Sequence, residues 1–436
     1  MMRIRKIPKL KFVKSNQHLA RAEITIPLGS QTFSKSRMQY PVGISPLYAS
    51  KSKGCYLWDL DGNKFIDLVS ALASVTLGYS DRSLRTDVSK QLKKAVSMSL
   101  PGVLEAEVSE LLVSMIPSAE MVRFGKNGSD ATAAAIRLAR AYTGRDQVVV
   151  CGYHGWQDWY IGSTTRNKGV PNSVSKLTHK FQYNNLESLI AIMNEYGKSV
   201  AAIMMEPMNS TYPDKLFLET VKEIAEKYGA LLIFDETITG FRFAAGGAQE
   251  FFGVTPHLST FGKGMANGFP LSAVVGSRDI MMEMEQIFFS GTFGGELLSL
   301  AAAKHVLNRH MNEDLSVELQ LLGSSLAEKT SEVIESSKLA TTVKLTGHPS
   351  WKFFEWQNTA DISSNEIKTF FTQLVFERGL LVLGTHNITL AHNRNIQAKI
   401  SEIYSDCFSR IHRAIEDDSL RQQLRVTPLE PVFKVR

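Results

Sequence analysis

The middle of the chain alternates short apolar runs with segments of helical periodicity. Short apolar runs indicate buried strands, whereas apolar positions three and four residues apart indicate amphipathic helices. Alternation of this kind is typical of a mainly parallel sheet covered on both faces. The expected strands are 147–152, 201–206, 231–236, 259–263 and 271–276, and the expected helices are 184–197 and 217–229, each closed by a glycine suited to a C-cap.

Both ends of the chain show the pattern of smaller α/β pieces. Residues 55–69 form a hairpin signal around an Asp-Gly-Asn turn at 61–63. Residues 343–393 predict further strands and a helix, and 400–417 is an amphipathic closing helix. We therefore expect an α/β protein with a large central domain and a small domain built from both chain ends. The expected ranges are 1–95 for the N-terminal segment, 96–330 for the large domain and 331–436 for the C-terminal small domain.

The charge of the chain is concentrated at its N-terminus. Of 436 residues, 44% are hydrophobic and 21% are charged, which is typical of a globular protein, and the net charge is +6. No acidic residue precedes Glu23. We interpret the excess of positive charge as belonging to a solvated N-terminal tail, with binding of an anionic partner as the alternative. Its cations are Arg3, Arg5, Lys6, Lys9, Lys11 and Lys14.

Targeting and redox features point to the cytoplasm. The tail lacks the apolar core of a secretory signal, and Pro8 interrupts the helix that a transit peptide needs. No apolar run has the ~20 residues of a membrane span. The three cysteines are scattered along the sequence, so we expect no disulfide and no metal site. We also expect no membrane and no nucleic-acid partner. The cysteines are Cys55, Cys151 and Cys407.

Two charged residues stand at the ends of expected strands. Asp235 closes the strand 231–236, and Lys263 follows the next one between two glycines. A carboxylate removed from water costs several kcal/mol unless a positive group meets it. Desolvation lowers the pKa of a lysine and suits it to form a Schiff base, although a lone lysine more often reaches solvent. Ligands on parallel sheets bind beyond these strand ends.

A glycine-containing helix start offers a phosphate site. In "RFGKNGSDATAAAIRLARAYTG", residues 123–144, Ser129 is the expected N-cap and Gly128 permits close approach of a ligand. The unpaired N–H groups of such a helix start attract anions, although capping alone also explains these residues. The expected buried face holds Ala135, Leu138, Ala139 and Tyr142.

An aromatic loop follows the strand 147–152. In "CGYHGWQDWYIG", residues 151–162, Tyr153 and His154 together with three further aromatic residues offer a stacking face for a planar ligand, with loop packing as the alternative. Phosphate donors, a stacking face, a carboxylate and a lysine together are the requirements for pyridoxal phosphate (PLP), whose pyridine nitrogen the carboxylate keeps protonated. The other aromatic residues of the loop are Trp156, Trp159 and Tyr160.

Other cofactor classes fit the sequence less well. "FGKNGSD" lacks the spacing of a nicotinamide-binding fingerprint, and "FGKGM" lacks the Ser or Thr of a P-loop. His305 and His310 are five residues apart, which does not suit a metal site on one helix face. A non-catalytic PLP-fold binding protein stays open as an alternative from another class.

The pattern "FDETITGFR…GGAQEFFGVTP…FGK", residues 234–263, resembles the class-III aminotransferases of the fold-type I PLP enzymes. The resemblance runs from about Gln39 to the C-terminal helix and is strongest to the glutamate-1-semialdehyde 2,1-aminomutase branch. It implies that Lys263 forms the Schiff base and shuttles protons, and that Asp235 pairs with the pyridine nitrogen. It also implies a homodimer with composite sites, in which "SGTFGG" lends a threonine to the neighbouring subunit's phosphate. The remaining implied cofactor-binding residues are Gly128, Ser129, Tyr153, His154, Glu206 and Thr292.

Departures from the aminomutase pattern concern the substrate. "GISPLYAS" places Tyr48 where the aminomutases have an arginine for the substrate carboxylate, and a neutral phenol cannot replace its paired charge. Gly384 or Thr385 stands where they have a gating glutamate. We therefore expect transamination between an amino donor and an aldehyde or ketone acceptor, through a pyridoxamine phosphate intermediate, with the aminomutase reaction as the alternative. Candidate groups for an anionic substrate are Arg242, His154, His386 and Arg394, with an ion pair in the loop after the strand as the alternative for Arg242. Lys126, beside the phosphate loop, either adds positive charge there or faces solvent.

Overall fold

The computed structural model describes residues 10–430 and divides them into two compact units. Unit 1 joins residues 10–81 with 319–430, and unit 2 comprises 82–318. The domain ranges expected from the sequence stay predictions. Of the basic N-terminal tail, Arg3, Arg5, Lys6 and Lys9 lie outside the described residues, whereas Lys14 belongs to helix α1.

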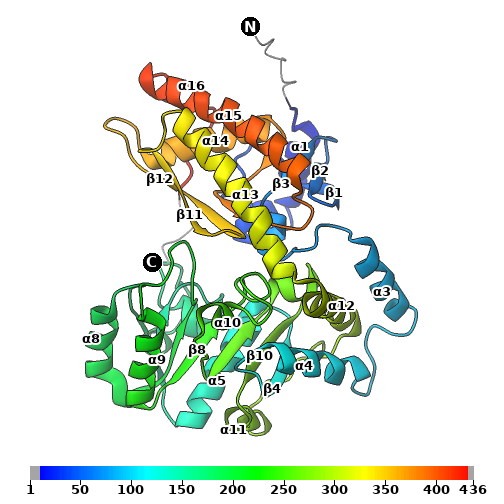
Figure 1. The fold of residues 1–436 in the computed structure, drawn as a ribbon, viewed down its shortest axis with the longest axis vertical. Coiled ribbons are helices and arrows are strands. Elements are labelled where there is room, and N and C mark those ends of the chain that lie inside the picture. Colours follow the sequence, from blue (N-terminus) through cyan, green and yellow to red (C-terminus); the bar gives the residue numbers. More distant parts are fainter. Residues whose placement is uncertain (1–9, 431–436) are drawn as a thin grey trace. The chain divides into compact units, whose positions relative to one another are not determined.

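Unit 2 is built on a mainly parallel sheet of seven strands in the order β4-β10-β9-β8-β7-β5-β6 (Figure 1). The five strands from β9 to β6 run parallel, and β10 is antiparallel to both of its neighbours. The fold class expected from the sequence is confirmed. The strands are β4 (Met121–Gly125), β5 (Gln147–Cys151), β6 (Thr178–Lys180), β7 (Val200–Met205), β8 (Leu231–Asp235), β9 (Leu258–Phe261) and β10 (Ser272–Gly276).

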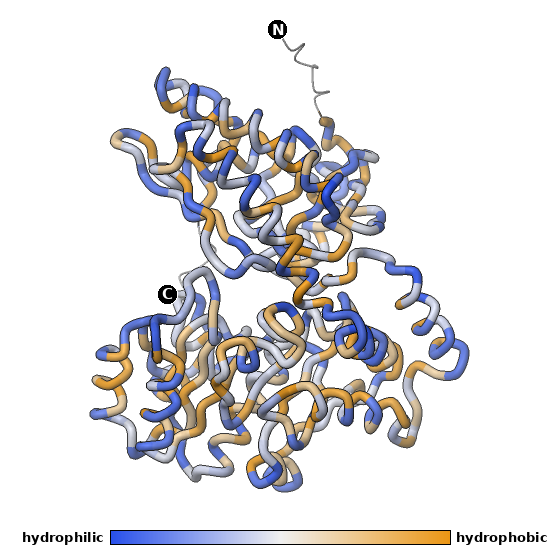
Figure 2. Tube along the Cα trace, viewed as in Figure 1, coloured by the Kyte–Doolittle hydropathy of each residue, from blue (hydrophilic) through white to orange (hydrophobic). Residues whose placement is uncertain are grey.

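The two faces of this sheet carry separate hydrophobic cores because successive side chains of a strand point in opposite directions. Val148 and Val150 belong to the core that includes α5, whereas Val149 belongs to the core that includes α8 and α9. In Figure 2 the outer helices alternate hydrophobic and hydrophilic positions, as helices that cover a sheet do. Asp235 follows Leu231 and Ile233 on the α5 face, so its carboxylate lies at the strand end beside the start of α5.

The helices of unit 2 follow the expected pattern with two corrections. Gly229 has φ +65° and ends α9 as expected, but Gly197 has φ −51° and continues into a 3-10 turn. Tyr142, expected on the buried face of α5, is 47% exposed. The helices are α3 (Arg82–Leu92), α4 (Val103–Met115), α5 (Gly128–Thr143), α6 (Asp158–Ile161), α7 (Asn172–Ser175), α8 (Leu186–Tyr196), α9 (Phe217–Tyr228), α10 (Ala248–Phe252), α11 (Arg278–Met281) and α12 (Leu297–Glu313); α13 (Leu315–Ser336) continues into unit 1.

Unit 1 contains two small sheets, β1-β2-β3-β13 and β11-β12-β14. The predicted hairpin is present as the antiparallel pair β2 and β3, with Gly62 at φ +85° in the turn. The core of the unit combines residues from both ends of the chain, such as Phe65 and Phe408. The elements are α1 (Val13–Ala22), β1 (Ala49–Lys53), β2 (Tyr56–Asp59), β3 (Lys64–Asp67), α2 (Ser70–Ala73), β11 (Val343–His348), β12 (Trp351–Trp356), α14 (Ser364–Glu377), β13 (Leu380–Leu381), β14 (Thr385–Asn387), α15 (Arg394–Glu416) and α16 (Leu420–Gln423).

The short element α2 winds in the left-handed sense. All four residues, Ser70–Ala73, have positive φ and none is glycine, which costs about 1–2 kcal/mol for each residue. The buried carboxylate of Asp67 holds this turn: Oδ1 accepts the N–H groups of Val69 and Ser70 at 2.7 and 3.0 Å, and Oδ2 accepts the Tyr79 hydroxyl at 2.6 Å. The turn borders a cavity of about 280 Å³ within unit 1.

Candidate active site

Asp235 is fixed by four hydrogen bonds at the end of β8. Its Oδ1 accepts the Thr237 N–H at 3.1 Å, the Thr237 hydroxyl at 2.6 Å and the Thr260 hydroxyl at 3.1 Å. Its Oδ2 lies 2.9 Å from His154 Nδ1. Burial raises the pKa of Asp235, but the hydrogen bonds from His154 and Thr237 outweigh it and leave the pKa below its usual value. The carboxylate is therefore ionised and held in one orientation.

His154 reaches Asp235 from the aromatic loop after β5. Because an ionised carboxylate only accepts hydrogen bonds, Nδ1 of His154 is the donor. The ring packs beside Trp159, at 6.5 Å and nearly parallel, and edge-on to Tyr160 at 5.3 Å. Its Nε2 is buried and finds no partner within residues 10–430. The loop thus supplies a positioning residue for the carboxylate, and Trp159 and Tyr160 are core residues rather than a stacking face.

Lys263 follows β9 in a strained conformation. Its φ is +42°, which is uncommon for a residue other than glycine, and such strain is typical of functional sites. Burial lowers the pKa of its ammonium group, Arg242 lowers it further, and Asp235 and Glu206 oppose both effects. Among the described residues its ammonium group makes no ion pair, so both carboxylates act from beyond 4.0 Å. A less basic amine close to two carboxylates is suited to act as a nucleophile and base.

The start of α5 differs in one detail from the expected phosphate site. Asn127 is the N-cap, and the carboxylate of Asp130 accepts the N–H groups of Lys126 and Asn127 at 3.0 and 2.8 Å. Ser129 is therefore not the N-cap; its hydroxyl accepts the Trp156 N–H at 3.3 Å. A Cβ on Gly128 would lie 3.1 Å from Thr237 Cγ2, so the helix start lies close to the strand end that carries Asp235.

Gly155 fixes the distance between the aromatic loop and this helix start. Its φ is +106°, and a Cβ there would lie 2.3 Å from Ser129 Oγ. We expect Gly155→Ala to weaken PLP affinity at least about tenfold, which corresponds to about 1.4 kcal/mol, since the added methyl displaces Ser129 from the start of α5. Titration with PLP, followed by visible absorbance, measures this effect.

Gly169 provides the matched control for that variant. Its φ is +93°, and a Cβ on this residue would have no heavy atom within 4 Å. Gly169→Ala therefore carries the same kind of backbone cost without displacing Ser129, and we expect it to retain the PLP affinity of the unaltered protein. Equal loss in both variants would contradict the assigned role of the Gly155–Ser129 contact.

Glu206 lies at the end of β7, close to the same loop. Its Oε2 accepts the Tyr153 N–H at 3.2 Å, and Asn209 Nδ2 lies 3.2 Å from Oε1. A Cβ on Gly152 would lie 2.4 Å from Glu206 Oε2, so only glycine permits this approach. Burial raises the pKa of the Tyr153 phenol, and Asp235 adds to the effect. Tyr153 is 44% exposed, and its stacking role stays a prediction.

The residues so far named fit PLP. Asp235 Oδ2 accepts one donor from the described residues and can accept a second, as a pyridinium N–H requires. Gly128 and Ser129 present a helix N-terminus for a phosphate, and Lys263 supplies an amine. Residues that hold this arrangement but were not expected are Thr237, Thr260, Gly155 and Asn209.

Three further residues of unit 2, Thr292, Lys126 and Arg242, were expected to bind the cofactor or the substrate. Thr292 is exposed and borders a cavity of about 400 Å³ with Lys126 and Asp130. The ammonium group of Lys126 pairs with Glu296 at 3.1 Å rather than facing solvent. Arg242 is 1% exposed, and burial lowers its pKa to about 10. A substrate role for Arg242 stays a prediction.

Two residues of unit 1, His386 and Arg394, were expected to bind the substrate. His386 is 1% exposed, and its Nε2 lies 2.7 Å from the Tyr404 hydroxyl. Burial lowers its pKa to about 3, and Phe354 covers its ring edge-on at 5.0 Å. The side chain of His386 is therefore buried in the core of unit 1, and its expected substrate role stays a prediction. Arg394 begins α15 and is exposed.

Tyr48 borders the 280 Å³ cavity of unit 1. Its hydroxyl donates to the Gly29 carbonyl at 2.7 Å, and its ring lies edge-on to His18 at 4.4 Å. Burial, with Glu23 as a smaller cause, raises the pKa of the phenol. Tyr48 is therefore a neutral group in a cavity with mainly apolar walls.

Comparison with known proteins identifies the family. Residues 39–415 match the class-III aminotransferases. The chain is 35% identical over 363 residues to a glutamate-1-semialdehyde 2,1-aminomutase of Syntrophobacter fumaroxidans, which covers 79% of this chain and 84% of the relative. It is 31% identical over 422 residues to the enzyme of that name from Alkaliphilus metalliredigens, with 89% and 96% covered.

Solved structures agree with this assignment. The FumI protein of Sphingopyxis sp. MTA144, in its PLP internal aldimine form, superimposes with a TM-score of 0.86 at 26% identity, covering 93% of this chain and 98% of that one. A glutamate-1-semialdehyde aminomutase from Pseudomonas aeruginosa has the same fold, with a TM-score of 0.80 at 21% identity over 92% of this chain and 95% of that one.

The chain belongs to the class-III aminotransferases. It is a PLP-dependent enzyme of that family, and the expectation from the sequence is confirmed at this level. Between residues 10 and 430, no helix combines the length and the hydrophobicity that crossing a membrane requires. The same residues contain no group of three or more potential metal ligands.

Proposed function

We propose that this enzyme transfers an amino group from an amino donor to an aldehyde or ketone acceptor, with Lys263 and Asp235 as its central residues. The observation that carries the proposal is the state of Lys263: a desolvated amine with a lowered pKa, near Asp235 and Glu206 but paired with neither. PLP, when bound, supplies an electron sink for the substrate carbon. Lys263 Nζ then removes a proton from one carbon atom and returns it to another.

The surrounding residues set the conditions for that proton transfer. Asp235 holds negative charge against the pyridine nitrogen, and His154 with Thr237 and Thr260 keeps the carboxylate in place. Gly128 and Ser129 offer the N-terminus of α5 to the phosphate. Tyr153, whose phenol pKa Asp235 helps to raise, would stack on the ring of the bound cofactor.

Tyr48 favours transamination over the aminomutase reaction. A substrate with a carboxylate next to the reacting centre is best held by a guanidinium group, and a neutral phenol whose hydroxyl already donates to Gly29 supplies no charge. The aminomutase reaction stays the second candidate because the relatives from Syntrophobacter fumaroxidans and Alkaliphilus metalliredigens carry that name.

Visible absorbance of the purified enzyme tests the function. We expect a yellow band from PLP bound to Lys263, which one amine from a panel bleaches and a keto acceptor restores. Incubation with glutamate-1-semialdehyde alone tests the second candidate, since an aminomutase completes its reaction without an external acceptor. Product in that assay, with no amine able to bleach the band, would overturn transamination.

The proposal includes a homodimer. Unit 2 exposes large apolar side chains in two segments, 96–103 and 288–293, and the Leu297 N–H, four residues after the second segment, donates to the Val96 carbonyl at 2.9 Å. Exposed apolar side chains in such numbers are typical of interfaces, and Thr292 lies in the second segment. The exposed residues are Val96, Met98, Leu100, Val103, Phe288 and Phe293.

Charge placed in this surface tests the dimer. We expect the double variant Phe288→Asp with Phe293→Asp to sediment as a monomer and to lose PLP affinity, because each phosphate site then lacks the neighbour's threonine. Ile190→Asp, on the exposed side of α8, is the matched control and should remain dimeric. An unaltered protein that sediments as a monomer while it binds PLP tightly would reject this part of the proposal.

The proposed location is the cytoplasm. All three cysteines are scattered along the sequence and buried, which agrees with a reducing compartment, although burial alone would also protect them. Cell fractionation against a cytoplasmic marker checks this placement.

A further inference from the structure

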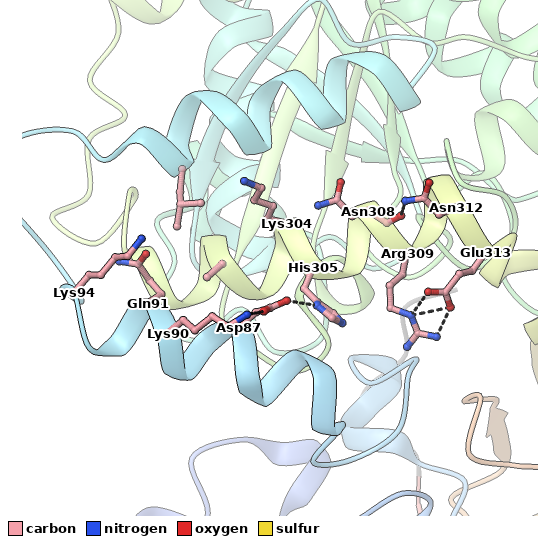
Figure 3. A pocket seen from close by; sticks show the side chains of 12 residues that line it. Asp87, Lys90, Gln91, Lys94, Lys304, His305, Asn308, Arg309, Asn312 and Glu313 are labelled. Carbon is pink, nitrogen blue, oxygen red and sulfur yellow. Dashed lines mark hydrogen bonds and ion pairs between the residues drawn. The ribbon is translucent and has the colours of Figure 1, made fainter.

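A second polar cavity lies in unit 2 between helices α3 and α12 (Figure 3). Its volume is about 430 Å³, and its walls come mainly from α3 and α12, with Leu104 added by α4. Leu104 and Ala301 are the only apolar residues of its walls among the described residues. None of the residues assigned to PLP lines it. The cations and amides that face it include Lys90, Lys94, Gln91, Asn308 and Arg309.

Two residues of the cavity wall, His305 and Asp87, form a hydrogen-bonded relay with Ser83. His305 Nδ1 lies 2.8 Å from Asp87 Oδ2, and His305 Nε2 lies 3.2 Å from Ser83 Oγ. Ser83 and Asp87 are four residues apart on α3, so they share one face of that helix, and His305 approaches them from α12. Lys90 holds the second carboxylate oxygen, with its ammonium group 3.0 Å from Oδ1.

The direction of each hydrogen bond follows from the carboxylate. Hydrogen bonds from His305 and then Lys90 lower the pKa of Asp87, so this group is an anion at neutral pH and only accepts. Nδ1 of His305 must then be the donor to Asp87. In the neutral ring the other nitrogen, Nε2, is an acceptor, and the Ser83 hydroxyl donates its proton to it.

We infer that Ser83, His305 and Asp87 form a Ser-His-Asp triad in which Ser83 is an acylatable nucleophile, a function separate from amino transfer. Such triads are recognised by geometry and roles rather than by order along the chain. Nucleophile and base lie near 3 Å from one another, and the base is oriented by a third group, as that arrangement requires.

The reaction that fits the relay is the hydrolysis of an activated ester. Ser83 Oγ forms a bond to the ester carbonyl carbon while its proton moves to His305 Nε2, and the alkoxide or phenolate leaves with that proton. Water then attacks the acyl group with the same base, which releases the acid and restores Ser83. The lysines and the arginine in the cavity wall suit a short polar or anionic acyl group. The side chain of Asp87 is 44% exposed, and solvent weakens its electrostatic effect on His305. The expected substrate class is therefore an ester with a good leaving group.

A fluorophosphonate probe on the PLP-bound full chain tests the inference. The probe forms a bond between phosphorus and the serine oxygen and releases fluoride, and peptide mass spectrometry locates the adduct. We expect labelling at Ser83, none there in Ser83→Ala, and at least about 100-fold slower labelling in His305→Gln, the lower end of what a general base contributes. Ser89→Ala, at an exposed serine of the same helix, is the matched control and should label like the unaltered protein.

Asp87 acts as a positioning residue, and a separate readout distinguishes this from a structural role. Hydrolysis of a p-nitrophenyl ester should show a lower acylation rate constant in Asp87→Asn, with unchanged half-saturation by the ester and an unchanged PLP absorbance band. An adduct at Ser83 that forms equally fast in His305→Gln, or no adduct at Ser83 in the native protein, would overturn the triad. Both results leave amino transfer unaffected, because Lys263 and Asp235 lie outside this cavity.

Discussion

Replacement of Lys263 with alanine is expected to reduce kcat/KM for amino transfer by about 10³-fold or more, within the range that one general acid–base group commonly contributes. The reason is that Lys263 combines a lowered pKa with a position near Asp235 and Glu206. We also expect the variant to bind PLP without a covalent link, so that borohydride treatment adds no cofactor mass to the chain. Initial rates and intact mass measure the two effects.

Lys222→Ala is the matched control for that experiment. Lys222 lies on α9 with 36% of its side chain exposed, and it pairs only loosely with Glu226 at 3.9 Å. We expect its rate and its cofactor mass to equal those of the unaltered enzyme. If Lys263→Ala keeps a reducible link to PLP and a rate within tenfold, the assignment of the central lysine is wrong.

Asp235→Asn is expected to lower kcat by about 10²- to 10⁴-fold with a smaller effect on KM. An amide cannot balance the charge of a protonated pyridine nitrogen, and it also removes the anion that His154 faces at 2.9 Å. The expected signature is a loss concentrated in the chemical step, measured as kcat and KM, together with a shift of the visible band.

Asp146→Asn, at an exposed position before β5, tests whether the change of charge alone has an effect. We expect no change in kcat in that variant. Thermal unfolding of both variants shows whether Asp235→Asn remains folded. A folded Asp235→Asn enzyme with unaltered kcat would exclude Asp235 as the partner of the pyridine nitrogen.

The strands that carry the site could be predicted because their sequences are almost continuously apolar. The runs at 148–151 and 231–234 are buried on both faces of the sheet, as strands in the middle of a parallel sheet are. The direction of β10 could not be predicted in the same way, since an apolar run is equally compatible with a parallel or an antiparallel partner. Whether the strand pairs parallel or antiparallel depends on the segment that connects it to its neighbour, and the hydrophobic pattern of the strand does not determine the path of that segment.

The partners of Asp235 show the limit of sequence reasoning more sharply. Thr237 could have been found, because the side chain of an aspartate commonly accepts the backbone N–H two residues further on. Thr260 becomes a partner only through the register of β8 with β9, which pairs it with Asp235. His154 lies 81 residues away in sequence and approaches from a loop. Contacts of this kind depend on tertiary placement alone.

The burial of His386 could not be predicted for a related reason. Histidine is found both in sites and in cores, and the residues around position 386 do not distinguish the two. Its partner, Tyr404, lies on α15, and Phe354 lies on β12, so its burial arises from three separate elements. The N-cap of α5 differs from the expected residue by two positions because Asn127 and Ser129 are both good capping residues.

The composition of unit 1 has a consequence for the synthesis of the chain. Its core joins residues from Phe12 to Val69 with residues from Leu319 to Leu420, whereas unit 2 is continuous from 82 to 318. A ribosome releases the N-terminal part first, and these residues must wait until α15 has been made before their apolar side chains are covered. Unit 2 can fold during that interval. The apolar side chains of the early segment therefore wait longer for their final partners than those of unit 2 do.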